Sequence, residues 1–113
     1  MTFSEVQQNL YRQGLLDERK CMTFGVMDSY LGEFSCLAII KGNALKIYLS
    51  DATLKLGTLR HELPICNLKD VKTRSFVLAP KVEFTYANRH YILTRIGNAR
   101  QFIDEFKKEN QGR

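Results

Sequence analysis

The chain has 113 residues, of which 44% are hydrophobic and 26% charged, and 17 basic against 12 acidic residues give it a net charge of +5. This length suits one domain with its own core and excludes a large multidomain enzyme. The composition is that of a folded globular protein, and it excludes a disulfide scaffold and a transmembrane protein.

The charge is unevenly distributed along the chain. Residues 1–40 carry three basic and five acidic residues, whereas residues 41–100 carry eleven basic and four acidic residues. The basic excess therefore lies in the middle of the chain, and an anionic partner is expected to bind there.

The first predicted element is a short helix within residues 1–14. Ser4 and Gln7 have capping-box spacing, and Gly14 suits the helix end because glycine tolerates a positive φ. A narrow apolar stripe follows at helical spacing and consists of Val6, Leu10 and Tyr11. This stripe could dock on the chain's own sheet or on a neighbouring copy.

From Cys21 the apolar residues alternate with a period of two, which predicts a strand. Residues 28–33 are predicted as a loop, and the apolar residues 34–40 as a central strand. Residues 41–43 are predicted as a turn, because glycine and asparagine tolerate positive φ. A second alternating strand then completes a hairpin with Leu45, Ile47 and Leu49 on one face.

One glycine and one proline interrupt the strand pattern in the next part of the chain. At Gly57 the apolar positions change phase, which predicts a bulge or bend. Pro64 interrupts this strand, and residues 67–70 are predicted as one turn before a strand over residues 71–77.

Two further strands are predicted at residues 81–86 and 90–96, and a closing helix follows. Asn98 and Gln101 have capping-box spacing, and residues 111–113 are expected to fray. The helix has an apolar stripe made of Ala99, Phe102, Ile103 and Phe106.

About seven short strands and one closing helix define the expected fold class, which is mainly β (α+β). The connections are short, which favours an antiparallel meander over parallel crossovers. Such a meander can bury one face only by bending into a sandwich or barrel, and the last helix is the expected cover for its open end.

This order of elements resembles the pleckstrin-homology (PH) superfold, in particular the small bacterial PH-like domains. The resemblance covers residues 15–110. It rests on an acidic lead-in, an apolar hairpin, a proline-containing connection and a closing helix at residues 15–20, 37–48, 63–71 and 98–106. The resemblance implies a PH-like interaction or assembly module at residues 15–110, preceded by the N-terminal helix. The hairpin turn departs from the family, because Gly42 and Asn43 stand where a basic residue is usual.

Metal and cofactor chemistry is not expected. The three cysteines, Cys21, Cys36 and Cys66, are odd in number and form no CxxC pair, so they are predicted to be buried or half-buried thiols in a reducing cytosol. His61 and His90 do not stand at zinc-ligand spacing from them.

Nor is catalysis expected. The sequence has no nucleophile elbow, phosphate loop or HExxH motif, and both histidines fall in predicted strands. The chain is therefore predicted to be non-enzymatic.

Anion binding is an open alternative. A lipid headgroup pocket needs cations around the first hairpin, where this chain has Asp28 and Glu33 instead. Strand alternation turns five cations outward, and these candidate anion-binding residues are Lys46, Lys55, Lys72, Arg74 and Lys81. Tyr48 and Phe76 are expected among them, as on surfaces that bind single-stranded nucleic acid, although no nucleic-acid family motif is present. The same cations could instead keep a sheet edge soluble.

The preferred function is protein–protein contact or self-association, because an open sandwich has strand edges that a peptide or a second copy can extend. Phospholipid or nucleic-acid binding through the basic strands is the alternative. No signal peptide is visible, and the longest apolar run spans residues 36–40, so the protein is predicted to be cytoplasmic.

Overall fold

Seven antiparallel strands form one sheet in the structure, a computed structural model that describes residues 2–50, 56–74, 79–97 and 99–111. The strands are β1 (Met22–Ser29), β2 (Gly32–Lys41), β3 (Ala44–Ser50), β4 (Leu56–Pro64), β5 (Lys69–Arg74), β6 (Lys81–Tyr86) and β7 (Arg89–Thr94). The remaining elements are α1 (Phe3–Arg12), the 3-10 turn η1 (Ile65–Asn67) and α2 (Ala99–Gln111). About 52% of the described residues are in strands, which confirms the mainly β fold class.

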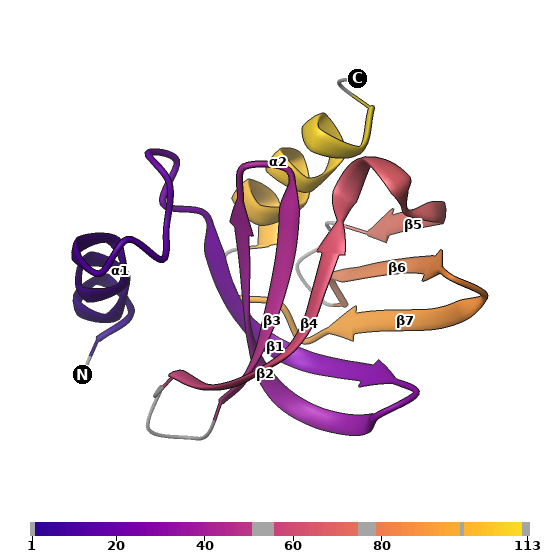
Figure 1. The fold of residues 1–113 in the computed structure, drawn as a ribbon, viewed down its shortest axis with the longest axis horizontal. Helices are drawn as coiled ribbons and strands as arrows, with labels where there is room; N and C mark the ends of the chain where they lie inside the picture. The colour runs from indigo at the N-terminus through magenta and orange to yellow at the C-terminus, as the bar shows by residue number, and fades with distance from the viewer. Residues whose placement is uncertain (1, 51–55, 75–78, 98, 112–113) are drawn as a thin grey trace.

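The sheet has the order β4-β3-β2-β1-β7-β6-β5, so β4 and β5 are its edges. The strands β1–β4 run across the strands β5–β7, and the sheet bends around a shared core (Figure 1). Sequential strands pair within β1–β4 and within β5–β7, as the sequence predicted. The prediction of one continuous meander is wrong at one place, because β1 pairs with β7 and the chain crosses through η1 from the β4 edge of the sheet to the β5 edge.

The core lies between the two parts of the bent sheet and is closed by α2 (Figure 1). Phe102, Ile103 and Phe106 of α2 are at most 1% exposed, which confirms the predicted stripe. The helix continues to Gln111 instead of fraying there, and Asn110 Nδ2 donates a hydrogen bond of 2.8 Å to Ile65 O in η1. The expected cap, Asn98, lies outside the described residues.

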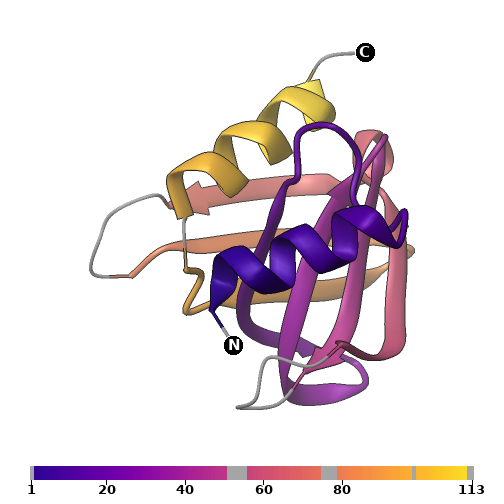
Figure 2. The same ribbon diagram turned by 90° about the vertical axis from the view of Figure 1, so that its left-hand side faces the viewer.

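Helix α1 lies across the outer face of β1, β2 and β3 (Figure 2). It makes a second apolar cluster there, which consists of Val6, Leu10, Leu16, Met22, Leu37, Ile39 and Tyr48. The stripe therefore packs on the chain's own sheet, although Tyr11 is 39% exposed and does not belong to it. The capping box begins two residues earlier than predicted, because Thr2 and not Ser4 is the N-cap and accepts from the backbone N–H of Glu5. Gly14 follows the helix with a φ of +80°, as expected of the residue that ends it.

Within the described part of the chain, no helix combines the length and apolarity that a bilayer crossing requires.

The first hairpin is longer than predicted. The residues expected to form a loop over 28–33 continue the ladder, with Asp28 opposite Glu33, and only Tyr30 and Leu31 lie between the strands. Polar residues are tolerated in these strands because the end of the hairpin is exposed. The amino-acid composition of residues 28–33 is therefore the same as that of a typical loop, although most of them are paired. The turn before β3 is confirmed, and Gly42 has a φ of +60°.

The pairing of β3 with β4 is irregular at two places, beside Tyr48. One irregularity lies where Gly57 approaches Leu49 O too closely for any Cβ, which confirms the predicted bulge. Tyr48 lies on the outer face of β3, opposite the core residues Leu45 and Ile47. It was wrongly predicted to be exposed: α1 covers this face and leaves Tyr48 8% exposed.

Candidate functional site

The outer face of β5, β6 and β7 carries three of the predicted cations. Arg74 on β5 lies opposite Lys81 on β6, and Lys72 lies opposite Glu83 in the next row. Alternate residues of a strand share a face, so these four side chains lie on one surface. The other face of these strands is turned toward the core, and Val82 of β6 is fully buried there.

A pocket of about 250 Å³ lies at the first of these rows. Its lining comes from the end of β5, the start of β6 and the end of β7, and consists of Arg74, Ala79, Pro80, Lys81, Thr94 and Arg95. Lys81 lies opposite Thr94 in the β6–β7 pairing. The end of β5, the start of β6 and the end of β7 therefore place three cations (Arg74, Lys81 and Arg95) and the Thr94 hydroxyl around the same pocket. Guanidinium and ammonium groups in this arrangement are donors for an oxyanion.

The three cations differ in their partners. Lys81 Nζ lies 3.1 Å from Glu83 Oε1, whereas no carboxylate among the described residues pairs with Arg74 or Arg95. Glu83 is the one acidic residue in the sequence from residue 71 to 103, against six basic residues. The pocket is therefore cationic, with two arginines available to a ligand.

Arg95 was missed by the sequence reasoning. A strand predicted to run to residue 96 places Arg95 on the core face with Tyr91 and Leu93. In the structure β7 ends at Thr94, and Arg95, with a φ of 55°, is exposed. The available signal was that an unpaired arginine is almost never buried, which indicates an earlier end to the strand.

The other predicted anion-binding residues do not join this pocket. Lys46 lies on β3, opposite Glu62, and the strands β2, β1 and β7 separate β3 from β6. Lys55 and Phe76 lie outside the described residues. Because Tyr48 is buried and Phe76 is not described, the structure does not place the predicted aromatic rings beside the predicted cations.

A second polar cluster surrounds the buried His61 of β4. Its Nε2 lies 3.0 Å from Ser29 Oγ, and its ring packs against Phe34 and Tyr91. Burial, together with the charge of Arg60, lowers the pKa of His61. A Ser–His pair invites comparison with a nucleophile and its base, but no carboxylate in the described ranges binds this imidazole, and Ser29 Oγ accepts from Leu31 N–H. The cluster holds the tip of the β1–β2 hairpin against β4.

Replacing His61 with glutamine should remove a pH dependence of stability. Because the folded state lowers the pKa of His61 below its ordinary 6.5, the unfolded chain binds this proton more readily. The free energy of unfolding of the wild type should therefore fall as pH decreases through 6.5, down to the folded-state pKa. Urea titrations between pH 7.5 and 5 should show a smaller loss for His61→Gln, while the exposed His90→Gln keeps the loss. Equal loss in His61→Gln and wild type would contradict this role.

The described residues around the three cysteines do not form a metal site. Burial raises the pKa of both Cys21 and Cys36 to about 12, whereas Cys66 is exposed, contrary to the prediction that all three are covered. Cys66 lines a hollow of about 610 Å³ between η1 and the β6–β7 turn. In the ranges that the structure describes, no three His, Cys, Asp or Glu side chains cluster to hold an ion.

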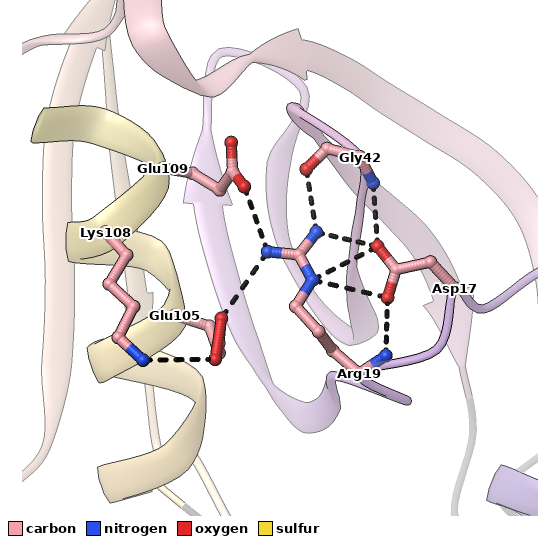
Figure 3. Close-up of polar contacts among 6 residues, drawn as sticks. All are labelled: Asp17, Arg19, Gly42, Glu105, Lys108 and Glu109. Carbon is pink, nitrogen blue, oxygen red and sulfur yellow. Dashed lines mark hydrogen bonds and ion pairs between the residues drawn. The ribbon is translucent and has the colours of Figure 1, made fainter. Parts of the chain in front are cut away.

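Arg19 forms the densest ion-pair network of the described chain (Figure 3). Its guanidinium lies 2.7 Å from Asp17, 3.4 Å from Glu105 and 3.0 Å from Glu109, and it donates to Gly42 O. Burial opposes ionisation of Asp17, but hydrogen bonds from the Arg19 side chain and from backbone N–H groups lower its pKa overall. The arginine's donors are satisfied by the protein, so the network joins the lead-in, the β2–β3 turn and α2 and offers no ligand site.

Comparison with protein-family models, curated proteins and solved structures finds no match to this chain.

Proposed function

We propose that this chain is a non-enzymatic PH-like binding module, and that its partner presents oxyanion groups to the pocket of Arg74, Lys81 and Arg95. The observation that carries the proposal is the convergence of three cations from neighbouring strands, two of them without a carboxylate partner among the described residues. The succession of seven antiparallel strands and a closing helix supports the PH-like resemblance. The location differs from a pocket at the first hairpin, where Asp28 and Glu33 would repel an anion.

Strand addition receives less support from the two sheet edges. Edge strand β4 has two register shifts and ends at Pro64, which cannot donate to a ladder. Edge strand β5 has a register shift between Lys69 and Lys72 and exposes charged side chains. Bulges and charges are the features by which sheets discourage pairing with another chain.

A protein partner is the second candidate function. Tyr30 and Leu31 at the tip of the β1–β2 hairpin are 54% and 46% exposed, and the Arg89 guanidinium lies 3.8 Å from the Tyr30 ring centroid. Exposed aromatic, aliphatic and arginine side chains are the types that interfaces favour. Contacts of this kind depend little on salt, whereas binding through oxyanions weakens as salt rises.

Replacing Arg74 and Arg95 together with glutamine should strongly weaken anion binding. Because each arginine can make charge-assisted hydrogen bonds to an oxyanion, we expect about a tenfold or greater loss of affinity for the pair. The experiment measures how much of each protein is retained at about 50 and 300 mM salt. The three probes are anionic vesicles, a single-stranded oligonucleotide and an immobilised phosphomonoester. The probe that retains the wild type at low salt identifies the source of the oxyanion.

The matched control is Lys46→Gln/Arg60→Gln, which removes two positive charges on β3 and β4 and leaves the pocket intact. It should keep the retention of the wild type. Absence of retention on every probe at low salt would overturn the proposal, and so would equal loss in the control. Circular dichroism of each variant checks that the sheet is unchanged.

A further inference from the structure

The sheet contains two cross-strand pairs of like charge, and the two pairs have opposite signs. Asp28 of β1 lies directly opposite Glu33 of β2, and Arg74 of β5 lies directly opposite Lys81 of β6. Like charges in directly opposite positions destabilise a sheet, so each pair would be stabilised by opposite charges from another molecule. The other cross-strand pairs of charged residues in the described ladders each join a cation to an acid: Lys46 with Glu62 and Lys72 with Glu83.

The acidic pair has no cation partner within the part of the chain that the structure describes. None of the ion pairs there involves Asp28 or Glu33, and both residues are exposed. The basic pair is partly satisfied, because Glu83 lies 3.1 Å from Lys81 while Arg74 pairs with none of the described carboxylates. Within one chain the two pairs stay apart, because β7 separates β1 from β6 and two strand spacings amount to about 10 Å.

Both pairs lie on the same outer face of the sheet. Asp28 lies opposite Ile92 of β7. In the neighbouring row, Thr94 lies between Val26 of β1 and Lys81 of β6. Directly opposite residues share a face, so this face changes from acidic on β1–β2, through the half-buried Val26 and Ile92, to basic on β5–β6.

We infer that this face binds a second copy of the chain, with the acidic pair of each copy against the basic pair and Arg95 of the other. The inference rests on the proposed function and names the partner, because the oxyanions that enter the pocket are then the carboxylates of Asp28 and Glu33 of a second copy. In a two-fold dimer every contact occurs twice. Such a dimer uses both pairs of both copies and leaves neither pair for a third copy.

The surroundings of the two pairs suit a weak contact between proteins. Val26 and Ile92 give the face an apolar centre with charges around it, which is the usual pattern of a protein interface. Because the sheet bends around the core, this face is convex, and two copies touch over a small area (Figure 1). Small interfaces are weak and transient, so we expect a dissociation constant of about 10–500 µM at low salt.

The test is sedimentation equilibrium over that concentration range, with two charge-reversal variants. The wild type should form a dimer at about 50 mM salt, and its dissociation constant should rise about tenfold or more at 300 mM. Asp28→Lys/Glu33→Lys and Arg74→Glu/Arg95→Glu should each be monomeric, because like charges then meet in both contacts of a dimer. An equimolar mixture of the two variants should form a dimer again, because both contacts of the heterodimer join opposite charges.

The matched control is Arg100→Glu/Lys107→Glu, which makes the same change of charge at two exposed positions of α2 and should dimerise like the wild type. A wild type that stays monomeric at low salt, a mixture that does not associate, or equal loss in the control would overturn this inference. Asp28→Asn/Glu33→Gln frees the pocket without adding cations, so it should be retained on the oxyanion probes at least as well as the wild type. If it is retained on none of them, the proposed function itself is overturned.

Discussion

Replacing Phe106 with aspartate is expected to leave the chain unfolded at 25 °C. Phe106 is fully buried, and its ring centroid lies 5.9 Å from that of Phe84 across the interface between α2 and the sheet. Loss of a buried phenylalanine costs about 3–5 kcal/mol, and a buried, unpaired carboxylate adds several more. A domain of this size has about 5–15 kcal/mol in total. Far-ultraviolet circular dichroism and amide chemical-shift dispersion should show the loss of structure.

Two variants make this result interpretable. Phe106→Ala should remain folded but lose about 3–5 kcal/mol in urea titrations, because it removes the ring without adding a charge. Lys107→Asp introduces the same carboxylate at the exposed neighbouring position, where we expect about 1 kcal/mol or less. A native spectrum for Phe106→Asp would mean that α2 does not close the core.

Replacing Arg19 with methionine should lower the free energy of unfolding by about 2–3 kcal/mol at neutral pH. The substitution keeps the aliphatic part of the side chain but leaves the carboxylates of Asp17, Glu105 and Glu109 without their shared cation (Figure 3). It also removes the donor to Gly42 O at the β2–β3 turn. Urea titrations of the two proteins measure the difference.

The control is Lys108→Met, which removes a second cation of the same network. Lys108 is 74% exposed and lies 3.6 Å from Glu105, so its loss should cost about 0.5 kcal/mol or less. The cost of Arg19→Met should also diminish in acid. The fold lowers the pKa of Asp17 below its ordinary 3.8, so this stabilisation is present above that pH and is lost as pH falls through the folded-state pKa. A cost that does not change between pH 7 and 3, or a cost for Lys108→Met as large as for Arg19→Met, would contradict this account.

Most elements of the fold could be predicted, because their side chains report a local environment. The stripe that ends at Phe106 predicted the closing helix, and the phase change at Gly57 predicted the bulge. The wrong predictions concern segments whose residues suit two local structures equally well. The residues at 28–33 suit an exposed hairpin end as well as a loop, and Thr2 and Ser4 both have side chains that can cap α1.

The site was predicted in part. Lys72, Arg74 and Lys81 were expected on outward faces, and β5 and β6 indeed bring them together. Their separation from Lys46 could not be predicted, because outward alternation holds within a strand and says nothing about which strands are neighbours. Arg95 joined the pocket only because β7 ends two residues earlier than predicted, at Thr94.

The fold class, the succession of strands, the closing helix and the concentration of positive charge in the middle of the chain could all be derived from the amino-acid sequence. These follow from periodicity and composition, which are local properties. The tertiary structure alone decided that α1 covers Tyr48, that His61 is buried against Ser29, and that Glu83 holds one cation of a three-cation pocket. The physical reason is that strand order, register and the end of each strand place residues far apart in the chain side by side, and the charge and burial of a site depend on those neighbours.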